Sequence, residues 1–379
     1  MKLGTLLSAF ACMTLSMGFA TPAKAEDPIK IGVYMPLTGQ NAFAGQLELE
    51  GIQLAHKITP TVLGRPVELV VVDNKSDKVE AANAVKRLAE RDNVTAIIGT
   101  YASSLSLAGG EVAERAKVPV LATSSTNPLV TQGKKYYFRA CFIDPYQGKK
   151  MADYAVEKLS AKTAAVFYQT GNDYSEGLMN AFVEKAAELG LEIVDTEAFA
   201  EGDKDFKAQM TNIAAADPDV VFAPIYYAEA GLAITAARAA GCDAVFMGGD
   251  GFGSVKNYAS ADDLEGSVYC SGYAPGTDSV KQFEEDYKAA YNVDEIPNMF
   301  APLAYDAAML LCEGLKAAEE QGLTAGTEEY KQAVIDAIKN MNGTEGITGS
   351  YSFDEYNNPI KPVAIIELTG GDEVYQEMY

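Results

Sequence analysis

The chain has 379 residues, with 53 acidic against 30 basic side chains and a formal net charge of −23. A charge of this sign and size makes nucleic acid and anionic membrane surfaces poor partners. Beyond the N-terminus no apolar run is long enough to span a bilayer, so we expect a soluble protein, and a chain of this length predicts two domains.

The N-terminus has the pattern of a secretory signal peptide. Lys2 precedes a mostly apolar stretch from Leu6 to Ala20, and Ala23-Lys24-Ala25 matches an Ala-x-Ala cleavage site. Polar residues interrupt the stretch, which is shorter than the roughly 20 residues of a spanning helix, so a membrane anchor is the weaker interpretation. We expect residues 1–25 to be removed on export.

Short β-branched runs alternate with segments of helical periodicity from Ile29 onward. The strands expected in this first series are 31–36, 67–73, 94–99 and 119–122. The helices expected between them are 45–58, 78–91 and 104–116. Such alternation predicts a parallel sheet with helices on both faces.

A second series of the same kind begins near Asp144. Its expected strands are 163–168, 192–195, 220–223 and 245–247, and its expected helices are 174–189, 205–216 and 229–240. The tail differs, with expected helices at 279–291, 302–320 and 328–340, followed by strand-like runs at 351–353, 363–367 and 374–378.

Neither series forms a complete domain without part of this tail, and no long flexible linker separates the two series. We therefore predict an α/β fold of two Rossmann-like lobes with parallel central sheets, joined by three crossover segments near 139–146, 268–274 and 347–351. Lobe 1 is expected to comprise residues 26–142 and 273–348, and lobe 2 residues 143–272 and 349–379.

Enzyme and metal motifs are missing. The first strand is not followed by G-x-G-x-x-G, and the sequence holds no Walker lysine motif, G-x-S-x-G or H-E-x-x-H. His56, the only histidine, lies on an amphipathic helix, so neither a triad nor a histidine metal site is expected. We predict no cofactor and no metal, while hydrolysis by a carboxylate pair stays formally open.

Four cysteines lie beyond the signal peptide, at positions 141, 242, 270 and 312. None has the C-x-x-C or other zinc-ligand spacing, which argues against a metal site. In an oxidising compartment a disulfide is open to them, and buried free thiols are an equal alternative.

Hydroxyl-rich loops follow two expected strands of the first series. Ser103 and Ser104 lead into a helix, where their hydroxyls and the free N–H groups suit a carboxylate. Plain N-capping explains the same pattern. Ser125 and Thr126 follow the neighbouring strand, so that two turns could together clamp one anion.

The second series carries aromatic hydroxyls and one acid at the equivalent strand ends. Tyr174, Tyr226 and Tyr227 lie in such loops. Asp250 stands among glycines, where the backbone can approach a ligand closely and the carboxylate can accept a bond from an ammonium. An aspartate in an ordinary turn is the alternative.

With these loops in place, the chain resembles the branched-chain amino-acid-binding proteins of ABC transporters, the leucine/isoleucine/valine-binding type of periplasmic receptor. The motifs that carry the resemblance run in order along the chain: Ile31-Gly-x-x-x-Pro-Leu-Thr-Gly39, Ile98-Gly99 before Ser103-Ser104, Ser125-Thr-Asn-Pro128, Asp173-Tyr174-x-Glu-Gly177, Gly202-Asp-Lys-Asp-Phe206 and Gly248-Gly-Asp250.

The resemblance implies a type I periplasmic binding fold and a role for each motif. Turns matching Ser103-Ser104 and Ser125-Thr126 hold the ligand α-carboxylate, while Tyr174 and Asp250 complete an ammonium site. The remaining candidates surround the ligand side chain: Phe43, Tyr101, Tyr226, Tyr227 and Phe252.

The chain also departs from this pattern. It lacks the cysteines of the disulfide near the receptor site, having Asn74 and Ala102 there, and the acid at the ammonium position is the shorter Asp250. Cys141 and Cys270 fall in expected crossovers, which suggests a bridge between them as a hypothesis.

The resemblance implies a periplasmic, monomeric binding protein that delivers an amino acid to an ABC permease in the inner membrane. The alternatives are a sensory protein of the same fold, a binder of urea, amides or aromatic acids, and an exported hydrolase.

Overall fold

The computed structural model describes residues 27–296 and 298–379. The expected signal peptide lies outside the described residues. Within them, none of the helices combines the length and apolar character that a membrane crossing requires.

Lobe 1 is built on a six-stranded sheet with the order β2-β3-β1-β4-β5-β6. The strands are β1 (Ile29–Met35), β2 (Thr61–Val62), β3 (Arg65–Asp73), β4 (Ala96–Ile98), β5 (Val120–Ala122) and β6 (Tyr137–Arg139). All pairs are parallel except the short β2–β3 hairpin, and the central strands are buried on both faces.

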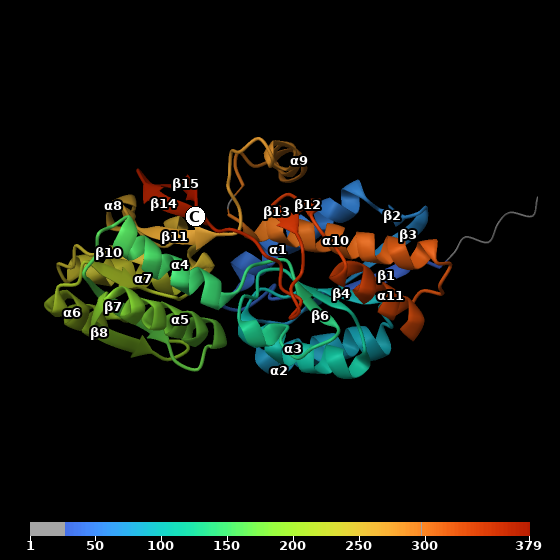
Figure 1. The fold of residues 1–379 in the computed structure, drawn as a ribbon, viewed down its shortest axis with the longest axis horizontal. Coiled ribbons are helices and arrows are strands. Elements are labelled where there is room, and N and C mark those ends of the chain that lie inside the picture. The colour runs from blue at the N-terminus through green and yellow to red at the C-terminus, as the bar shows by residue number, and fades with distance from the viewer. Residues whose placement is uncertain (1–26, 297) are drawn as a thin grey trace, which may run out of the picture.

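Six helices accompany this sheet: α1 (Ala42–Ile58), α2 (Lys78–Lys86), α3 (Ser103–Ala116), α9 (Lys281–Tyr291), α10 (Phe300–Glu320) and α11 (Glu328–Lys339). In Figure 1, α1 with α10 lies above the sheet and α2 with α3 lies below it. The long helices of the tail therefore complete the lobe formed by the first series, as expected.

Lobe 2 is built on a seven-stranded sheet with the order β15-β14-β11-β10-β9-β7-β8. Its strands are β7 (Thr163–Gln169), β8 (Glu192–Phe199), β9 (Val220–Phe222), β10 (Val245–Gly248), β11 (Val268–Ser271), β14 (Ala364–Thr369) and β15 (Asp372–Met378). Its helices are α4 (Asp144–Glu157), α5 (Asp173–Leu189), α6 (Lys207–Ala216), α7 (Tyr227–Ala239) and α8 (Ala261–Leu264). Strands β14 and β15 add antiparallel to the edge of β11. The predicted α/β fold of two mostly parallel sheets is confirmed.

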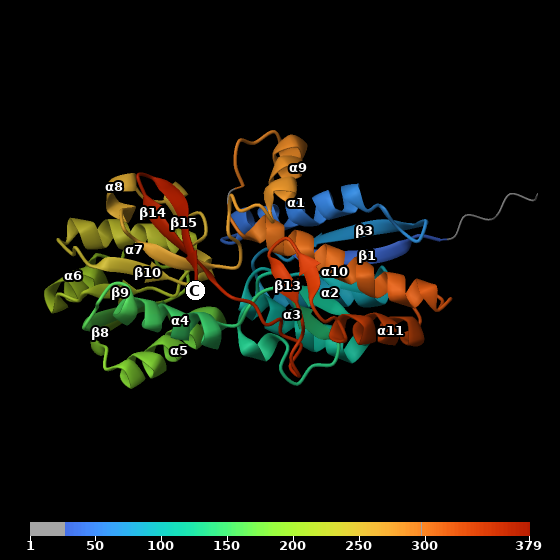
Figure 2. The ribbon, with the colours of Figure 1, turned by 45° about the horizontal axis from the view of Figure 1, so that its top comes forward.

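The chain passes three times between the lobes (Figure 2). The first passage, between β6 and α4, falls where it is expected. The second begins after Ser271, because residues 268–271 form strand β11 inside the lobe 2 sheet.

The third passage lies further along the chain than expected. After the hairpin of β12 (Thr344–Gly346) and β13 (Gly349–Tyr351), Asn357 still donates to the Tyr137 carbonyl at 3.1 Å and Lys361 to the Ala140 carbonyl at 3.4 Å, both in lobe 1. The Val363 carbonyl then accepts from Tyr379 of lobe 2. We therefore propose a third crossing at 361–363 in place of 347–351.

A candidate ligand site between the lobes

A small cavity of about 10 Å³ lies between the lobes. It is formed where loops at the carboxyl ends of β4 and β5 face those of β7, β9 and β10, the edge at which open α/β sheets bind ligands. Lobe 1 lines it with Tyr101, Ser103, Ser124 and Phe300, and lobe 2 lines it with Tyr174, Tyr226, Asp250 and Gly251. The two lobes leave room there for about one water molecule, so a larger ligand requires them to stand further apart.

Lobe 1 presents the start of helix α3 to this cavity. The first N–H groups of a helix have no partner within it, and they carry the positive end of the helix dipole. Ser103, the first residue of α3, accepts a hydrogen bond from the Asn127 backbone N–H at 3.1 Å, which ties the helix start to the second hydroxyl-rich turn. An anion at this point would meet donors that are already in position.

A buried arginine holds that second turn. Arg139 donates to the carbonyl of Ser125 at 2.7 Å, to that of Asn127 at 2.8 Å and to the Thr131 hydroxyl at 2.9 Å. Ser125 in turn donates to the Thr100 carbonyl at 2.6 Å, joining the turn to the loop after β4. The Thr126 hydroxyl is buried and has no hydrogen-bond partner.

Lobe 2 presents a carboxylate held by Gln147. The Gln147 side-chain amide donates to both Asp250 and Asp144 at 3.1 Å, and its oxygen accepts from the Asp250 backbone N–H at 3.1 Å. The Tyr174 hydroxyl accepts from the Gly251 N–H at 2.9 Å. A side chain at Gly251 would place its Cβ 2.9 Å from that hydroxyl, so glycine is needed for this approach.

Three carboxyl groups are buried around the cavity, and none of them forms an ion pair with another described residue. Burial raises the pKa of Asp250 to about 6, and it raises the pKa of Asp144 and of Glu48 to about 8. Each group also lies close enough to another for the two charges to repel. The site therefore favours a ligand with positive charge. Within residues 27–296 and 298–379, no group of three metal-ligating side chains lies close enough together to hold a metal ion.

Contacts outside the cavity hold the lobes together at its mouth. Asp173 of lobe 2 accepts a hydrogen bond from the Ser104 hydroxyl at 2.5 Å, and its carbonyl accepts from the Asn127 amide at 2.7 Å. Lys78 lies 3.7 Å from the same carboxylate. We call these residues the Asp173 latch. Because it joins the two lobes, the latch exists only when the cleft is closed.

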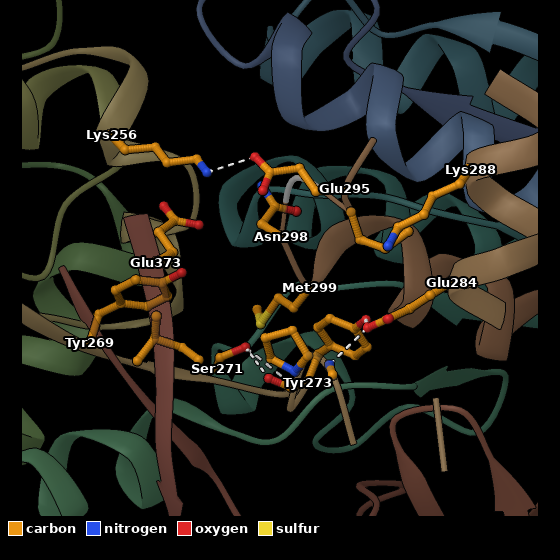
Figure 3. A pocket seen from close by; sticks show the side chains of 14 residues that line it. Lys256, Tyr269, Ser271, Tyr273, Glu284, Lys288, Glu295, Asn298, Met299 and Glu373 are labelled. Carbon is orange, nitrogen blue, oxygen red and sulfur yellow. Dashed lines mark hydrogen bonds and ion pairs between the residues drawn. The ribbon is translucent and has the colours of Figure 1, made fainter. Parts of the chain in front are cut away.

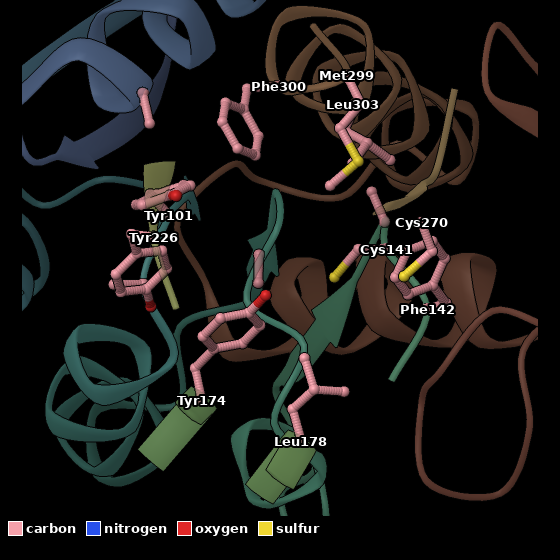
Figure 4. Packing of buried hydrophobic residues seen from close by; sticks show 14 of the residues in the cluster. Tyr101, Cys141, Phe142, Tyr174, Leu178, Tyr226, Cys270, Met299, Phe300 and Leu303 are labelled. Atoms are coloured by element: carbon pink, nitrogen blue, oxygen red, sulfur yellow. The ribbon is translucent and has the colours of Figure 1, made fainter. Parts of the chain in front are cut away.

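The structure brings five of the predicted site residues to the cavity: Tyr101, Ser103, Tyr174, Tyr226 and Asp250. Figure 4 shows the three tyrosines and Phe300 converging from the two lobes. Thr126 is buried in the adjoining turn. The remaining predicted residues have other surroundings.

Ser104 belongs to the Asp173 latch, and Ser125 supports the turn with its hydroxyl. Phe43 of α1 and Tyr227 of α7 pack edge to face across the lobes, with centroids 5.8 Å apart. Phe252 is fully buried inside lobe 2, where its ring lies 6.4 Å from that of Tyr269.

Several residues at the site are not among those predicted from the sequence. Ser124 belongs to the recognised hydroxyl run and could have been included with Ser125. Phe300, Gln147 and Glu48 lie in helices far along the chain from the loops that they meet, and no local pattern marks them. Only the tertiary packing brings them to the cavity.

All four cysteines of the described chain are free thiols. Cys141 donates to the Ser125 carbonyl at 3.3 Å and Cys270 to the Gln147 side-chain oxygen at 3.0 Å. Both lie in the packed region between the lobes (Figure 4). The hypothesised Cys141–Cys270 disulfide is therefore wrong for this structure.

A larger hollow, of about 180 Å³, lies beside the second passage between the lobes (Figure 3). Its charged groups are largely paired with one another: Lys256 lies 2.8 Å from Glu295, and Tyr273 and Gly276 both donate to Glu284. None of its lining side chains has a buried polar atom without a partner. The inter-lobe cavity is the better candidate because its polar groups remain available.

Two lobes that close over a small polar cavity at their strand ends define a cleft-type ligand-binding protein. The model of the periplasmic binding protein family matches residues 28–372. The leucine-, isoleucine-, valine-, threonine-, and alanine-binding protein of Pseudomonas aeruginosa is 31% identical over 368 residues, covering 94% of each chain. This chain therefore belongs to the periplasmic binding protein family.

Solved structures agree with this assignment. The leucine-binding protein LivK of Thermotoga maritima is 37% identical with a TM-score of 0.85, covering 92% of this chain and 98% of that one. The branched-chain amino acid transporter substrate-binding protein LivJ of Streptococcus pneumoniae, in complex with isoleucine, is 32% identical with a TM-score of 0.84, covering 92% and 99%. The predicted family is confirmed.

Proposed function

We propose that this protein is the periplasmic binding component of an ABC importer and that it holds an α-amino acid in the inter-lobe cavity. One observation carries the proposal: a helix start and a hydroxyl-lined turn in lobe 1 face a buried carboxylate in lobe 2. An α-amino acid carries a carboxylate and an ammonium on a single carbon, so it matches both faces at once.

The side-chain end of the ligand would meet aromatic rings. Tyr101, Tyr226 and Phe300 line the cavity together and contact one another, with Tyr101 lying 5.3 and 4.9 Å from the other two ring centroids. Such walls favour an apolar side chain over a charged one. A branched-chain or similar apolar amino acid fits this arrangement, and the names of the relatives agree with it.

Binding is proposed to work by closure and without chemical change to the ligand. A ligand held by lobe 1 alone gains the Asp250 contact only when the lobes meet, so it shifts the population toward the closed form. The Asp173 latch adds its bonds in the same state. The closed monomer would then be presented to a permease in the inner membrane.

A thermal-shift screen tests the ligand class. Purified protein is heated with each of the common amino acids, urea, short amides and aromatic acids, and we expect the largest stabilisation from an apolar amino acid. A shift given only by urea, amides or aromatic acids would replace the amino-acid proposal. Turnover of a stabilising ligand would indicate a hydrolase.

Calorimetry on Asp250→Ala tests the site itself. We expect a loss of affinity of about 2–5 kcal/mol, because a buried ammonium would lose its charged partner. Asp243→Ala is the matched control, since Asp243 is an exposed aspartate of the same lobe and should bind as wild type does. Unchanged affinity in a folded Asp250→Ala variant would count against the site.

A further inference from the structure

The Ser124 hydroxyl lines the cavity and is hydrogen-bonded to a second buried acid. Ser124 lies in the turn after β5 and is 5% exposed. Its Oγ is bonded to Oε1 of Glu48, which projects from α1 of the same lobe. The ligand would therefore meet Glu48 only through this serine.

Glu48 has few means of carrying a negative charge. Its side chain is fully buried, and its second oxygen, Oε2, has no hydrogen-bond partner. None of the ion pairs among the described residues includes it. An unpaired buried carboxylate is costly, and the group responds by holding its proton more tightly.

The groups that face Glu48 do not relieve this cost. Asp250 of lobe 2 is a like charge, and the nearby hydroxyls of Thr123 and Ser124 are its polar neighbours from the turn after β5. Tyr34 of β1 and Tyr227 of α7 also lie within electrostatic reach. Burial raises the pKa of both tyrosines, so they stay neutral at physiological pH and offer Glu48 no positive charge.

A hydroxyl has one hydrogen to donate, so the state of Glu48 fixes what Ser124 can offer. A protonated Glu48 can donate its own hydrogen to Ser124 Oγ, which leaves the Ser124 hydrogen free for the cavity. An ionised Glu48 accepts the Ser124 hydrogen and leaves only lone pairs facing the cavity. A ligand carboxylate is stabilised by the first arrangement and repelled by the second.

We propose that Glu48 is a positioning residue whose protonation state decides whether the Ser124 hydroxyl donates to the ligand carboxylate. This inference rests on the proposed function, since it requires a carboxylate on the lobe 1 side of the cavity. It adds an upper pH limit to amino-acid binding. The protonated form binds, and binding above neutral pH takes up a proton from solvent.

Calorimetry at pH 7 and pH 9 tests the proposal, with L-leucine as the probe or L-alanine if the thermal-shift screen selects it. Burial raises the pKa of Glu48 to about 8, so the wild-type affinity should fall about tenfold between these values. Near pH 8, comparison of buffers with different ionisation enthalpies should show uptake of about half a proton per bound ligand.

Two variants should remove that pH dependence. Glu48→Gln keeps the size and donates an amide hydrogen to Ser124, so its affinity should not fall between pH 7 and pH 9 and its binding should take up no proton. Ser124→Ala removes the group that transmits the change, so it should bind more weakly and without the tenfold fall. Deprotonation of the ligand ammonium lowers the affinity of all variants equally, so this part of the fall is subtracted.

Asp144 titrates in the same range and provides the decisive control. Burial raises its pKa to about 8 as well. If Asp144→Asn loses the fall while Glu48→Gln keeps it, Asp144 is the titrating group and the proposal is wrong. The proposal is also overturned if wild type shows no fall or Ser124→Ala retains it. If no amino acid binds wild type at pH 7, the proposed function itself fails.

Discussion

The two faces of the cleft present different chemical groups to a ligand. Lobe 1 presents backbone N–H groups and hydroxyls, held in place by the buried Arg139 and by the start of α3. Lobe 2 presents an ionisable carboxylate, Asp250, held by the amide of Gln147. Burial raises the pKa of Glu48 to about 8 and that of Asp250 to about 6, so base changes the first face and acid changes the second. Recognition of a zwitterion thus combines a half that is sensitive to base with a half that is sensitive to acid.

Removing Arg139 should have the largest effect and should break the lobe 1 face. Arg139→Met leaves the carbonyls of Ser125 and Asn127 and the Thr131 hydroxyl without their buried donor. Because each such group costs about 1–3 kcal/mol, we expect the free energy of unfolding to fall by at least about 3 kcal/mol. Thermal unfolding followed by circular dichroism measures the loss.

The control for this variant is Arg115→Met, because Arg115 is exposed at the end of α3 in the same lobe. It should unfold at the wild-type temperature. An Arg139→Met protein as stable as that control would show that the turn holds itself without the arginine.

Acid should act next most strongly, and it should act on the lobe 2 face alone. Burial raises the pKa of Asp250 to about 6, so lowering the pH through 6 protonates it and removes the charge that pairs with an ammonium. We expect amino-acid affinity to fall about tenfold from pH 7 to pH 5. Calorimetry at the two values measures it, and Asp250→Asn should show no such fall.

Burial of these carboxyl groups also predicts how the stability of the ligand-free protein changes with pH. A carboxyl whose pKa is raised by folding binds its proton more tightly in the folded state, so stability is greatest below its unfolded pKa, near 4. It should decline as the pH rises from about 4 to about 8, the range set by Asp250, Asp144 and Glu48.

Weakening the Asp173 latch should have the smallest effect, since it touches neither face of the cavity. Asp173→Ala removes the carboxylate that accepts from Ser104 and lies near Lys78. A bond that exists only in the closed form contributes about 0.5–1.5 kcal/mol, so affinity should fall about two- to tenfold through faster dissociation. Stopped-flow kinetics measure the rate, and Asp205→Ala, at an exposed position of lobe 2, is the control.

Much of this fold can be predicted from the periodicity of the sequence and from the topology rules for α/β sheets. Alternating strands and helices predict two parallel sheets, and the rule that ligands bind at carboxyl strand ends selects Ser103, Tyr174 and Asp250, which line one cavity. Short elements such as β6 and the β12–β13 hairpin give too little pattern to be recognised. The crossing expected at 347–351 overlaps that hairpin, which is why we propose a later one.

Geometry explains why some predicted site residues lie away from the cavity. Ser103 and Ser104 are neighbours at the start of α3, but successive helical residues point about 100° apart, so one faces the cavity and the other the Asp173 latch. Glu48 sits in an ordinary amphipathic helix and becomes part of the site only because α1 packs beside the turn after β5. Such a residue has no signal within its own segment.

The central claim is that the ligand ammonium is paired with Asp250, and a double-mutant cycle tests it most directly. Wild type and Asp250→Asn are each titrated with the bound amino acid and with its α-hydroxy acid analogue, in which a hydroxyl replaces the ammonium. We predict a coupling free energy of at least about 1.5 kcal/mol between the ammonium and the carboxylate. A coupling of zero, with Asp250→Asn affecting both ligands equally, would contradict the claim.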